Sequence, residues 1–313
     1  MKNEEKIKVI AIVGPTASGK TGLSIKLAQR LGGEIVSADS IQVYEGMQIA
    51  SAKPSESEKE GIPHYLIGYV PMGTSYNVSI YVSDAKKVID DIVKRGKLPI
   101  VVGGTGLYID SLLNSVSFSK EDNTEKIRRE LEIRLEKEGI EALYNELSEI
   151  DPKSAESIHI NNTKRVLRAL EIYYTTGKTM TEQKKLSKAE PSPYDVIYIG
   201  LKCKDREKLY DRINKRVDIM LEMGLLEEAK QVLKSNLSET AKAAIGYKEL
   251  KPYIDGEVSF SDAVEKLKRE TRRYAKRQLT WFMRNDKINW IDIDTLSVDE
   301  IIKQAENICK EVV

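Results

Sequence analysis

A short apolar segment followed by a turn framed by two glycines constrains this chain more than any other feature. The segment Val9 to Val13 precedes the eight residues Gly14-Pro15-Thr16-Ala17-Ser18-Gly19-Lys20-Thr21. A strand that leads into G-x-x-x-x-G-K-T is typical of a phosphate-binding loop, whose successive N–H groups face an anion at a helix N-terminus. Lys20 adds a positive charge, and the Thr21 hydroxyl suits Mg²⁺. We therefore expect a di- or triphosphate ligand with magnesium, because an ordinary glycine turn would not explain the Lys-Thr pair.

The apolar pattern beyond this loop predicts an α/β fold. Strand-like runs alternate with helical patterns, and they lie at 9–13, 34–37, 99–102, 196–201 and 288–293. A helix is expected over 77–95, with Asn77 as its N-cap and Gly96 as its stop. Such alternation is typical of a parallel sheet with helices on both faces. The expected fold class is therefore an α/β, P-loop NTPase-like parallel sheet core with a helical insertion domain.

The length of the chain and one long block without strand signals predict two parts. The chain has 313 residues, more than the usual single domain of about 100–150 residues. Between the third and fourth strand-like runs, apolar residues recur only at helical spacing. Connections in such sheets are usually far shorter. We therefore expect a tRNA-contacting helical insertion over 114–193, within a catalytic core formed by 1–113 and 194–313.

Composition excludes several classes of protein. Hydrophobic residues make up 41% of the chain and charged residues 32%, and no apolar stretch approaches the roughly 20 residues of a membrane span. The N-terminus runs into the first strand without a secretory signal, so a cytoplasmic location is expected. Cys203 and Cys309 are too few and too far apart for a zinc site or a disulfide framework. No metal other than magnesium, no membrane and no obligate protein partner are indicated.

Two loops that follow predicted strands carry further candidate residues. In open α/β sheets, reactive groups lie beyond the carboxyl ends of the strands. Asp39 follows the second run and places a carboxylate beside the phosphate loop. There it suits a general base or a magnesium partner acting through water, or alternatively a helix N-cap. Gly103-Gly104-Thr105 follows the third run and offers amides and a hydroxyl to an anion, although a glycine turn entering a helix looks similar.

Basic residues are unevenly distributed, although the net charge is only +1. Between Asp262 and Lys287, nine Lys or Arg residues stand against four Asp or Glu, interleaved with Tyr274 and Trp281. This pattern indicates either a nucleic-acid surface or a solvated amphipathic helix. Arg216 falls beside the apolar stripe of an earlier helix and is expected to point toward the core or a cleft. Its anionic partner is either a ligand phosphate or an internal carboxylate.

Seven segments, spread over nearly the whole chain, form a specific combination. They are Gly14 to Thr21, Asp39-Ser40-Ile41-Gln42-Val43-Tyr44, Ala52-Lys53-Pro54, Val102 to Tyr108, Arg165-Val166-Leu167-Arg168-Ala169-Leu170-Glu171, Ile245-Gly246-Tyr247 and Ala275-Lys276-Arg277-Gln278-Leu279-Thr280-Trp281. In this order they resemble the tRNA dimethylallyltransferase family, and only the phosphate loop is generic. The chain lacks the C-terminal zinc finger of the eukaryotic members and resembles the shorter bacterial form.

The resemblance implies a reaction. In that family the phosphate loop binds the pyrophosphate of dimethylallyl pyrophosphate, and the exocyclic N6 amine of the adenosine 3′-adjacent to the anticodon attacks the prenyl carbon, releasing pyrophosphate. By resemblance, Asp39 would accept the amine proton. The groups that would stabilise the departing pyrophosphate are Lys20, Thr105, Arg216 and Mg²⁺ held by Thr21. The catalytic residues that the resemblance implies are Asp39, Thr105 and Arg216.

The resemblance also implies a tRNA-binding surface. The target base must leave the anticodon stack to reach the cleft, so recognition should rest largely on shape and backbone. By resemblance, the residues near tRNA are Asp39, Ser40, Ile41, Gln42, Thr105, Arg128, Lys164, Arg165, Arg168, Gly246, Tyr247, Lys248, Arg273 and Arg277. Ser40 and Gln42 suit the edges of bases, whereas Arg128 and Lys164 are equally explained as solvated charges. We expect the basic C-terminal stretch to lie away from the phosphate loop.

Three other functions are compatible with parts of the sequence. A small-molecule kinase also needs a phosphate loop and an aspartate after the second strand, although no compact arginine-rich lid is evident here. An adenylate isopentenyltransferase acting on free nucleotide would not need an RNA-binding surface. A nucleotide-dependent RNA-binding module without catalysis would leave Asp39 without a chemical role.

Overall fold

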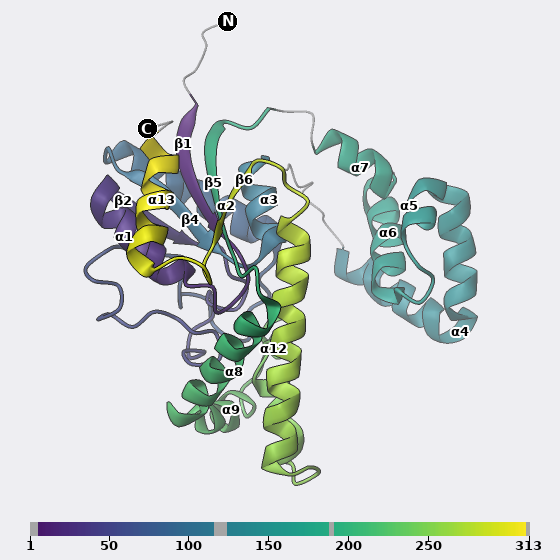
Figure 1. The fold of residues 1–313 in the computed structure, drawn as a ribbon. Coiled ribbons are helices and arrows are strands. Elements are labelled where there is room, and N and C mark those ends of the chain that lie inside the picture. Colours follow the sequence, from purple (N-terminus) through teal and green to yellow (C-terminus); the bar gives the residue numbers. More distant parts are fainter. Residues whose placement is uncertain (1–5, 116–123, 188–190, 311–313) are drawn as a thin grey trace, which may run out of the picture. The chain divides into compact units, whose positions relative to one another are not determined.

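A six-stranded parallel sheet lies at the centre of the computed structural model, which describes residues 6–115, 124–187 and 191–310 (Figure 1). Its strands are β1 (Ile7–Val13), β2 (Gly33–Ser37), β3 (His64–Tyr65), β4 (Leu98–Gly103), β5 (Tyr194–Lys202) and β6 (Ile288–Asp292). They lie in the order β3-β2-β4-β1-β5-β6, and every pair is parallel. The predicted α/β class and all five predicted strands are confirmed. Only β3 was not predicted, because two residues are too short to show an alternating pattern.

The chain divides into two compact units, Met1–Leu113 with Pro193–Val313, and Asn114–Ser192. The helices of the first unit are α1 (Lys20–Leu31), α2 (Val78–Lys94), α3 (Gly106–Leu113), α8 (Arg206–Glu222), α9 (Leu225–Val232), α10 (Glu239–Lys242), α11 (Tyr247–Ile254), α12 (Phe260–Phe282) and α13 (Val298–Lys310). Those of the second unit are α4 (Thr124–Ile150), α5 (Pro152–Ser157), α6 (Thr163–Thr176) and α7 (Met180–Leu186).

Helices cover both faces of the sheet in the first unit (Figure 1). Alternate β1 residues such as Ile10 and Ile12 join one buried cluster with side chains of α1 and α13. Since successive strand side chains point to opposite faces, Val9 and Ala11 face the other side, and all four are fully buried. Burial on both faces explains why β1 reads as an uninterrupted apolar run.

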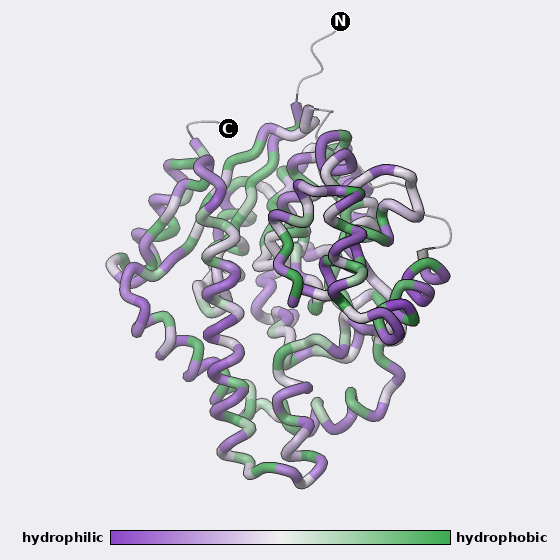
Figure 2. Tube along the Cα trace, turned by 90° about the vertical axis from the view of Figure 1, so that its right-hand side faces the viewer, coloured by the Kyte–Doolittle hydropathy of each residue, from purple (hydrophilic) through white to green (hydrophobic). Residues whose placement is uncertain are grey.

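The second unit has its own apolar core. Leu143 and Leu147 of α4 pack with Val166 and Leu170 of α6. The backbone kinks at Gly139 of α4, where φ is 80°. Helices of both units carry hydrophobic and hydrophilic residues in alternation along the trace (Figure 2). Such amphipathic helices bury one stripe and leave the other in water.

The register of the central strands brings three loops together. Val13 at the end of β1 pairs with Gly103 at the end of β4, and Ser37 at the end of β2 pairs with Val102. The carboxyl ends of parallel neighbours meet at one edge of a sheet. The phosphate loop, the loop that carries Asp39 and the loop that carries Thr105 therefore start side by side.

Candidate active site

The phosphate loop adopts the tight backbone that its glycines permit. Gly14 has a φ of +144°, and a Cβ there would lie 2.5 Å from the carbonyl oxygen of Leu201. Gly19, with a φ of 89°, is the residue before α1. Ala17 also has a positive φ of 61°, and Arg212 of α8 donates a 3.0 Å hydrogen bond from Nε to its carbonyl oxygen. The loop thus ends at a helix N-terminus, where backbone N–H groups favour an anion.

Two cations lie next to this loop, and no carboxylate in the described ranges is bonded to either. Lys20 Nζ donates a 2.7 Å hydrogen bond to the Pro15 carbonyl oxygen. Burial, helped by the positive charge of Arg216, lowers the pKa of Lys20 to about 7, against the attraction of Asp39. Burial also lowers the pKa of Arg216, and the charges of Asp39 and Glu58 oppose that shift. Within the described residues no hydrogen bond or ion pair engages the Arg216 guanidinium, so the arrangement favours a ligand anion over an internal salt bridge.

Asp39 presents one carboxylate oxygen to the chain and leaves the other available. Its Oδ1 accepts the N–H groups of Ile41 at 2.9 Å and Gln42 at 3.2 Å, which caps a turn and not a helix. Its Oδ2 has no hydrogen-bond partner in the described part of the chain. Next to it, Thr105 Oγ1 accepts the Ser40 N–H at 3.1 Å, and the Thr105 hydroxyl also interacts with the Tyr274 phenol.

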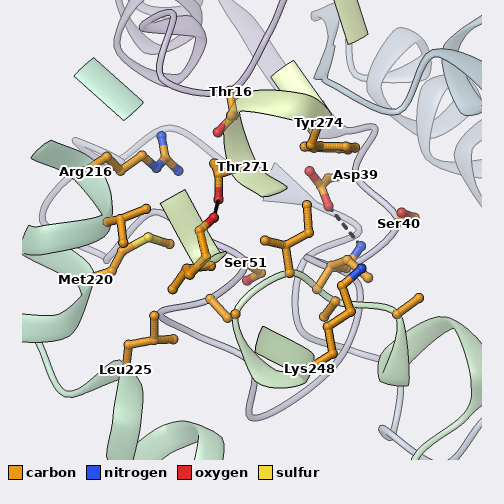
Figure 3. Close-up of a pocket in the computed structure, with 18 of the residues that line it drawn as sticks. Thr16, Asp39, Ser40, Ser51, Arg216, Met220, Leu225, Lys248, Thr271 and Tyr274 are labelled. Atoms are coloured by element: carbon orange, nitrogen blue, oxygen red, sulfur yellow. Dashed lines mark hydrogen bonds between the residues drawn. The ribbon is translucent and has the colours of Figure 1, made fainter. Parts of the chain in front are cut away.

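A cavity of about 270 Å³ opens beside Asp39 in the first unit. Polar and charged groups on one side of it in Figure 3 are Thr16, Asp39, Arg216 and Tyr274. Its apolar lining includes Val217, Met220, Leu225 and Leu267. Burial raises the pKa of Tyr274, and the charge of Asp39 raises it further, so the phenol keeps its proton. The cavity can hold a small apolar group next to an anion-binding loop and a carboxylate.

Comparison with known proteins identifies the family. A family model described as IPP transferase matches residues 42–286, and one described as isopentenyl transferase matches residues 7–71. A tRNA dimethylallyltransferase of Acetivibrio thermocellus is 50% identical over 301 residues, which cover 95% of this chain and 96% of the relative. One of Bacillus subtilis is 48% identical over 97% of this chain and 96% of its own length. The chain belongs to the tRNA dimethylallyltransferase family.

Solved structures of the dimethylallyltransferase family share the fold. A tRNA isopentenylpyrophosphate transferase from Staphylococcus epidermidis is 44% identical, with a TM-score of 0.72 over 98% of this chain and 100% of that one. A eukaryotic dimethylallyltransferase described as acting on tRNA is 34% identical, with a TM-score of 0.79 over 97% of this chain and 80% of that one. The family resemblance and the P-loop NTPase-like fold predicted from the sequence are confirmed.

Helix α12 approaches the phosphate loop, contrary to the sequence-based expectation. The Gln278 side chain accepts the Thr16 N–H at 2.8 Å and donates to the Gly104 carbonyl oxygen at 3.0 Å. A Cβ on Gly104 would lie 2.0 Å from Gln278 Nε2, so only glycine allows this approach. Arg277 therefore lines the cavity, whereas Arg273 is exposed and pairs with Glu270. The prediction that the basic stretch lies away from the phosphate loop is wrong, because helical periodicity gives no information on where a helix packs in the fold.

The wall of the cavity contains several of the predicted tRNA-binding residues. Ser40, Ile41, Gly246 and Lys248 line it. Tyr247 does not fit its predicted contact with RNA, because only 1% of it is exposed and its hydroxyl donates to Glu228.

The Gln42 amide is engaged within the protein. It accepts the Ser37 hydroxyl at 2.9 Å and donates to the carbonyl oxygens of Ser51 and Ala52. In this structure the side chain links the Asp39 loop to residues 51 and 52, and it does not present a free edge to a base. Its predicted contact with RNA therefore requires these bonds to break.

The remaining predicted tRNA contacts lie in the second unit. Lys164 and Arg165 are exposed at the start of α6. On the same helix Arg168 pairs with Glu171 at 3.0 Å, and on α4 Arg128 pairs with Glu132 at 3.3 Å. Both partners of the Arg128 pair are exposed, and exposed pairs contribute little to stability, which leaves Arg128 open to exchange Glu132 for a phosphate. Glu171 is buried, so Arg168 is held more firmly within its own helix.

Proposed function

We propose that the protein transfers the dimethylallyl group from dimethylallyl pyrophosphate to N6 of the adenosine 3′-adjacent to the anticodon of tRNA. The observation that carries this proposal is the pair of cations at the phosphate loop, Lys20 and Arg216, of which Arg216 also lines a cavity that is apolar on one side. A diphosphate with a short apolar tail fits both features. Membership of a family named for this activity supports the choice of donor and acceptor.

In the proposed reaction, a carbon–nitrogen bond forms while a carbon–oxygen bond breaks. The N6 amine forms a bond to the prenyl carbon while the bond from that carbon to the pyrophosphate oxygen breaks, and Asp39 Oδ2 takes the amine proton. Negative charge grows on the pyrophosphate, where Lys20 and Arg216 stabilise it more in the transition state than in the ground state. Asp39 Oδ1 stays bonded to the turn N–H groups, so the carboxylate is held in place while it acts.

The residues present fit a magnesium ion. Thr21 lies in the first turn of α1 beside the phosphate loop, and its side chain is exposed. The described ranges contain no group of three or more His, Cys, Asp or Glu that could hold a metal. Magnesium commonly takes one or two protein ligands and completes its shell with phosphate oxygens and water. Thr21 would hold the ion, with Asp39 acting through water, and the ion would neutralise part of the pyrophosphate charge.

The tRNA is the proposed macromolecular substrate. The exposed cations of α6, Lys164 and Arg165, and those of α12, Arg273 and Arg277, suit its phosphates. Since the substrate is tRNA, we place the enzyme in the cytoplasm, with no protein partner required. No helix within the described ranges is long and apolar enough to cross a membrane.

The choice of substrates can be tested in one experiment. Purified protein and magnesium are incubated with radiolabelled dimethylallyl pyrophosphate and either bulk tRNA lacking the modification or AMP. Label is expected in tRNA and not in AMP. Transfer to AMP alone would indicate an adenylate isopentenyltransferase. In a parallel incubation with ATP, consumption that depends on a small hydroxylated substrate, without prenyl transfer in the first incubation, would indicate a kinase.

A further inference from the structure

The carboxylate of Glu228 holds together a part of the cavity wall that contains none of the proposed catalytic residues. Its Oε2 accepts the N–H groups of Gln48 at 2.9 Å and Ile49 at 2.7 Å. Its Oε1 accepts the Ala50 N–H at 2.9 Å and the Tyr247 hydroxyl at 2.8 Å. Four donors thus converge on one side chain of α9, three of them successive amides of one loop.

These bonds supply acceptors that the loop itself does not provide. Residues 48–52 lie outside any helix or strand, with turns at 49–52, and Ala52 at their end has a positive φ of 48°. The bonds of Ile49 and Ala50 are partly buried, where an amide without an acceptor is costly, and bonds to a charged acceptor are stronger than neutral ones. The loop conformation therefore depends on a carboxylate at position 228.

The loop at residues 48–52 contacts the apolar side of the cavity. Ala50 and Ser51 line the cavity, together with Leu225 of α9 and Gly246 before α11. A Cβ on Gly246 would lie 3.3 Å from the Ala50 Cβ and 3.7 Å from Leu225 Cδ1, so the three segments meet there. In Figure 3, Leu225 lies across the cavity from Thr16 and Asp39. This junction is therefore a wall opposite the groups that handle the pyrophosphate and the proton.

We propose that Glu228 is a positioning residue that fixes this wall and thereby limits the donor to a five-carbon prenyl group. The inference rests on the proposed function, since it assumes that the tail of dimethylallyl pyrophosphate points from the phosphate loop toward Leu225. A longer prenyl chain then meets Ala50, Leu225 and Gly246. Discrimination against that chain depends on how firmly the wall is held, because a wall that can move apart admits the extra carbons.

The test compares Glu228→Gln with the matched control Glu227→Gln. Glu227 is the preceding residue, its side chain is 65% exposed, and its contact is a 3.8 Å pair with Lys230. In Glu228→Gln, an amide NH₂ group replaces one acceptor oxygen. It cannot accept hydrogen bonds, so the donors that were bonded to that oxygen lose their acceptor. We measure kcat and KM with dimethylallyl pyrophosphate and with geranyl pyrophosphate, using tRNA as the acceptor and confirming folding by thermal unfolding.

Glu228→Gln is expected to raise KM for dimethylallyl pyrophosphate about tenfold, the effect of losing one bond to a charged group. The preference for the five-carbon donor in kcat/KM should fall by at least about threefold, while the kinetics of Glu227→Gln stay at the wild-type values. An unchanged preference in folded Glu228→Gln would overturn the proposal, as would a loss of activity equal for both donors.

A second variant decides the matter if Glu228→Gln does not fold. Tyr247→Phe keeps the buried ring and removes one of the four bonds to Glu228. It should shift the donor preference in the same direction by about two- to threefold, and an unchanged preference would overturn the proposal. Failure of the proposed function is distinct, because the wild-type protein would then transfer no prenyl group from either donor.

Discussion

Burial beside the phosphate loop disfavours the charged form of Lys20, and repulsion from Arg216 disfavours it further. Both effects lower the pKa of Lys20, to about 7. A bound pyrophosphate would stabilise the protonated amine and raise its pKa. Below pH 7 the free protein already carries that proton. Above pH 7, binding of pyrophosphate must take up a proton at Lys20. The affinity for pyrophosphate therefore falls with rising pH, up to the pH that equals the pKa of Lys20 in the complex.

We therefore predict a steeper pH dependence of pyrophosphate inhibition in the wild-type protein than in Lys20→Met. Taking the ratio of the inhibition constants of the wild type and Lys20→Met at each pH removes the contribution of the ionisation of pyrophosphate itself, since that contribution is the same for both proteins. Above pH 7 the advantage of the wild type should shrink by up to about tenfold per pH unit, the limit for one proton. Inhibition measured from about pH 6 to pH 9 checks this. A constant ratio would mean that Lys20 binds with its charge already present throughout.

Among the elements, α12 connects the phosphate loop to the loop after β4 through one side chain. We predict that Gln278→Ala lowers the free energy of unfolding by about 1–3 kcal/mol, because the Thr16 N–H and the Gly104 carbonyl lose their partner. KM for dimethylallyl pyrophosphate should rise, since Thr16 belongs to the phosphate loop. Denaturant unfolding and steady-state kinetics provide the measurements. Lys276→Ala, at an exposed position on the same helix, should stay within about 0.5 kcal/mol.

The elements also show how far the sequence alone predicts this molecule. Strands such as β1 were predictable because burial on both faces leaves an apolar run, and α2 because Asn77 accepts the N–H groups of Ser79 and Ile80. Asp39 and Arg216 were found because strand ends and helical periodicity place them. The bonds of Gln278 join residues 262 and 174 positions apart, and those of Glu228 to the loop span about 180. Local pattern carries no information on contacts at such separations.

For the whole molecule, the proposal requires basic side chains on both units to bind RNA. We predict that the double variant Arg165→Glu/Arg168→Glu weakens tRNA binding at low salt. The slope of log affinity against log salt concentration should become shallower by about one to two, because fewer counterions are released. Pyrophosphate inhibition should be unchanged, since neither arginine lines the cavity beside the phosphate loop. The reversal Lys303→Glu/Lys310→Glu on α13 introduces the same charge change as a control.

Arg277 is expected to behave differently from these two arginines. It lines the same cavity as Thr16 and Arg216, so Arg277→Glu should weaken inhibition by pyrophosphate as well as tRNA binding. Competition assays with pyrophosphate and a tRNA titration check both effects. An effect on tRNA alone would place Arg277 outside the field of the donor site.

The central claim is that Asp39 accepts the proton of the attacking amine, and Asp39→Asn tests it most directly. The amide keeps the shape of the side chain and a carbonyl oxygen for the turn N–H groups, but it cannot act as the base. Single-turnover transfer from dimethylallyl pyrophosphate to saturating tRNA should slow by at least about 100-fold, with tRNA affinity nearly unchanged. A variant that keeps more than about a tenth of the wild-type chemical rate would contradict the account.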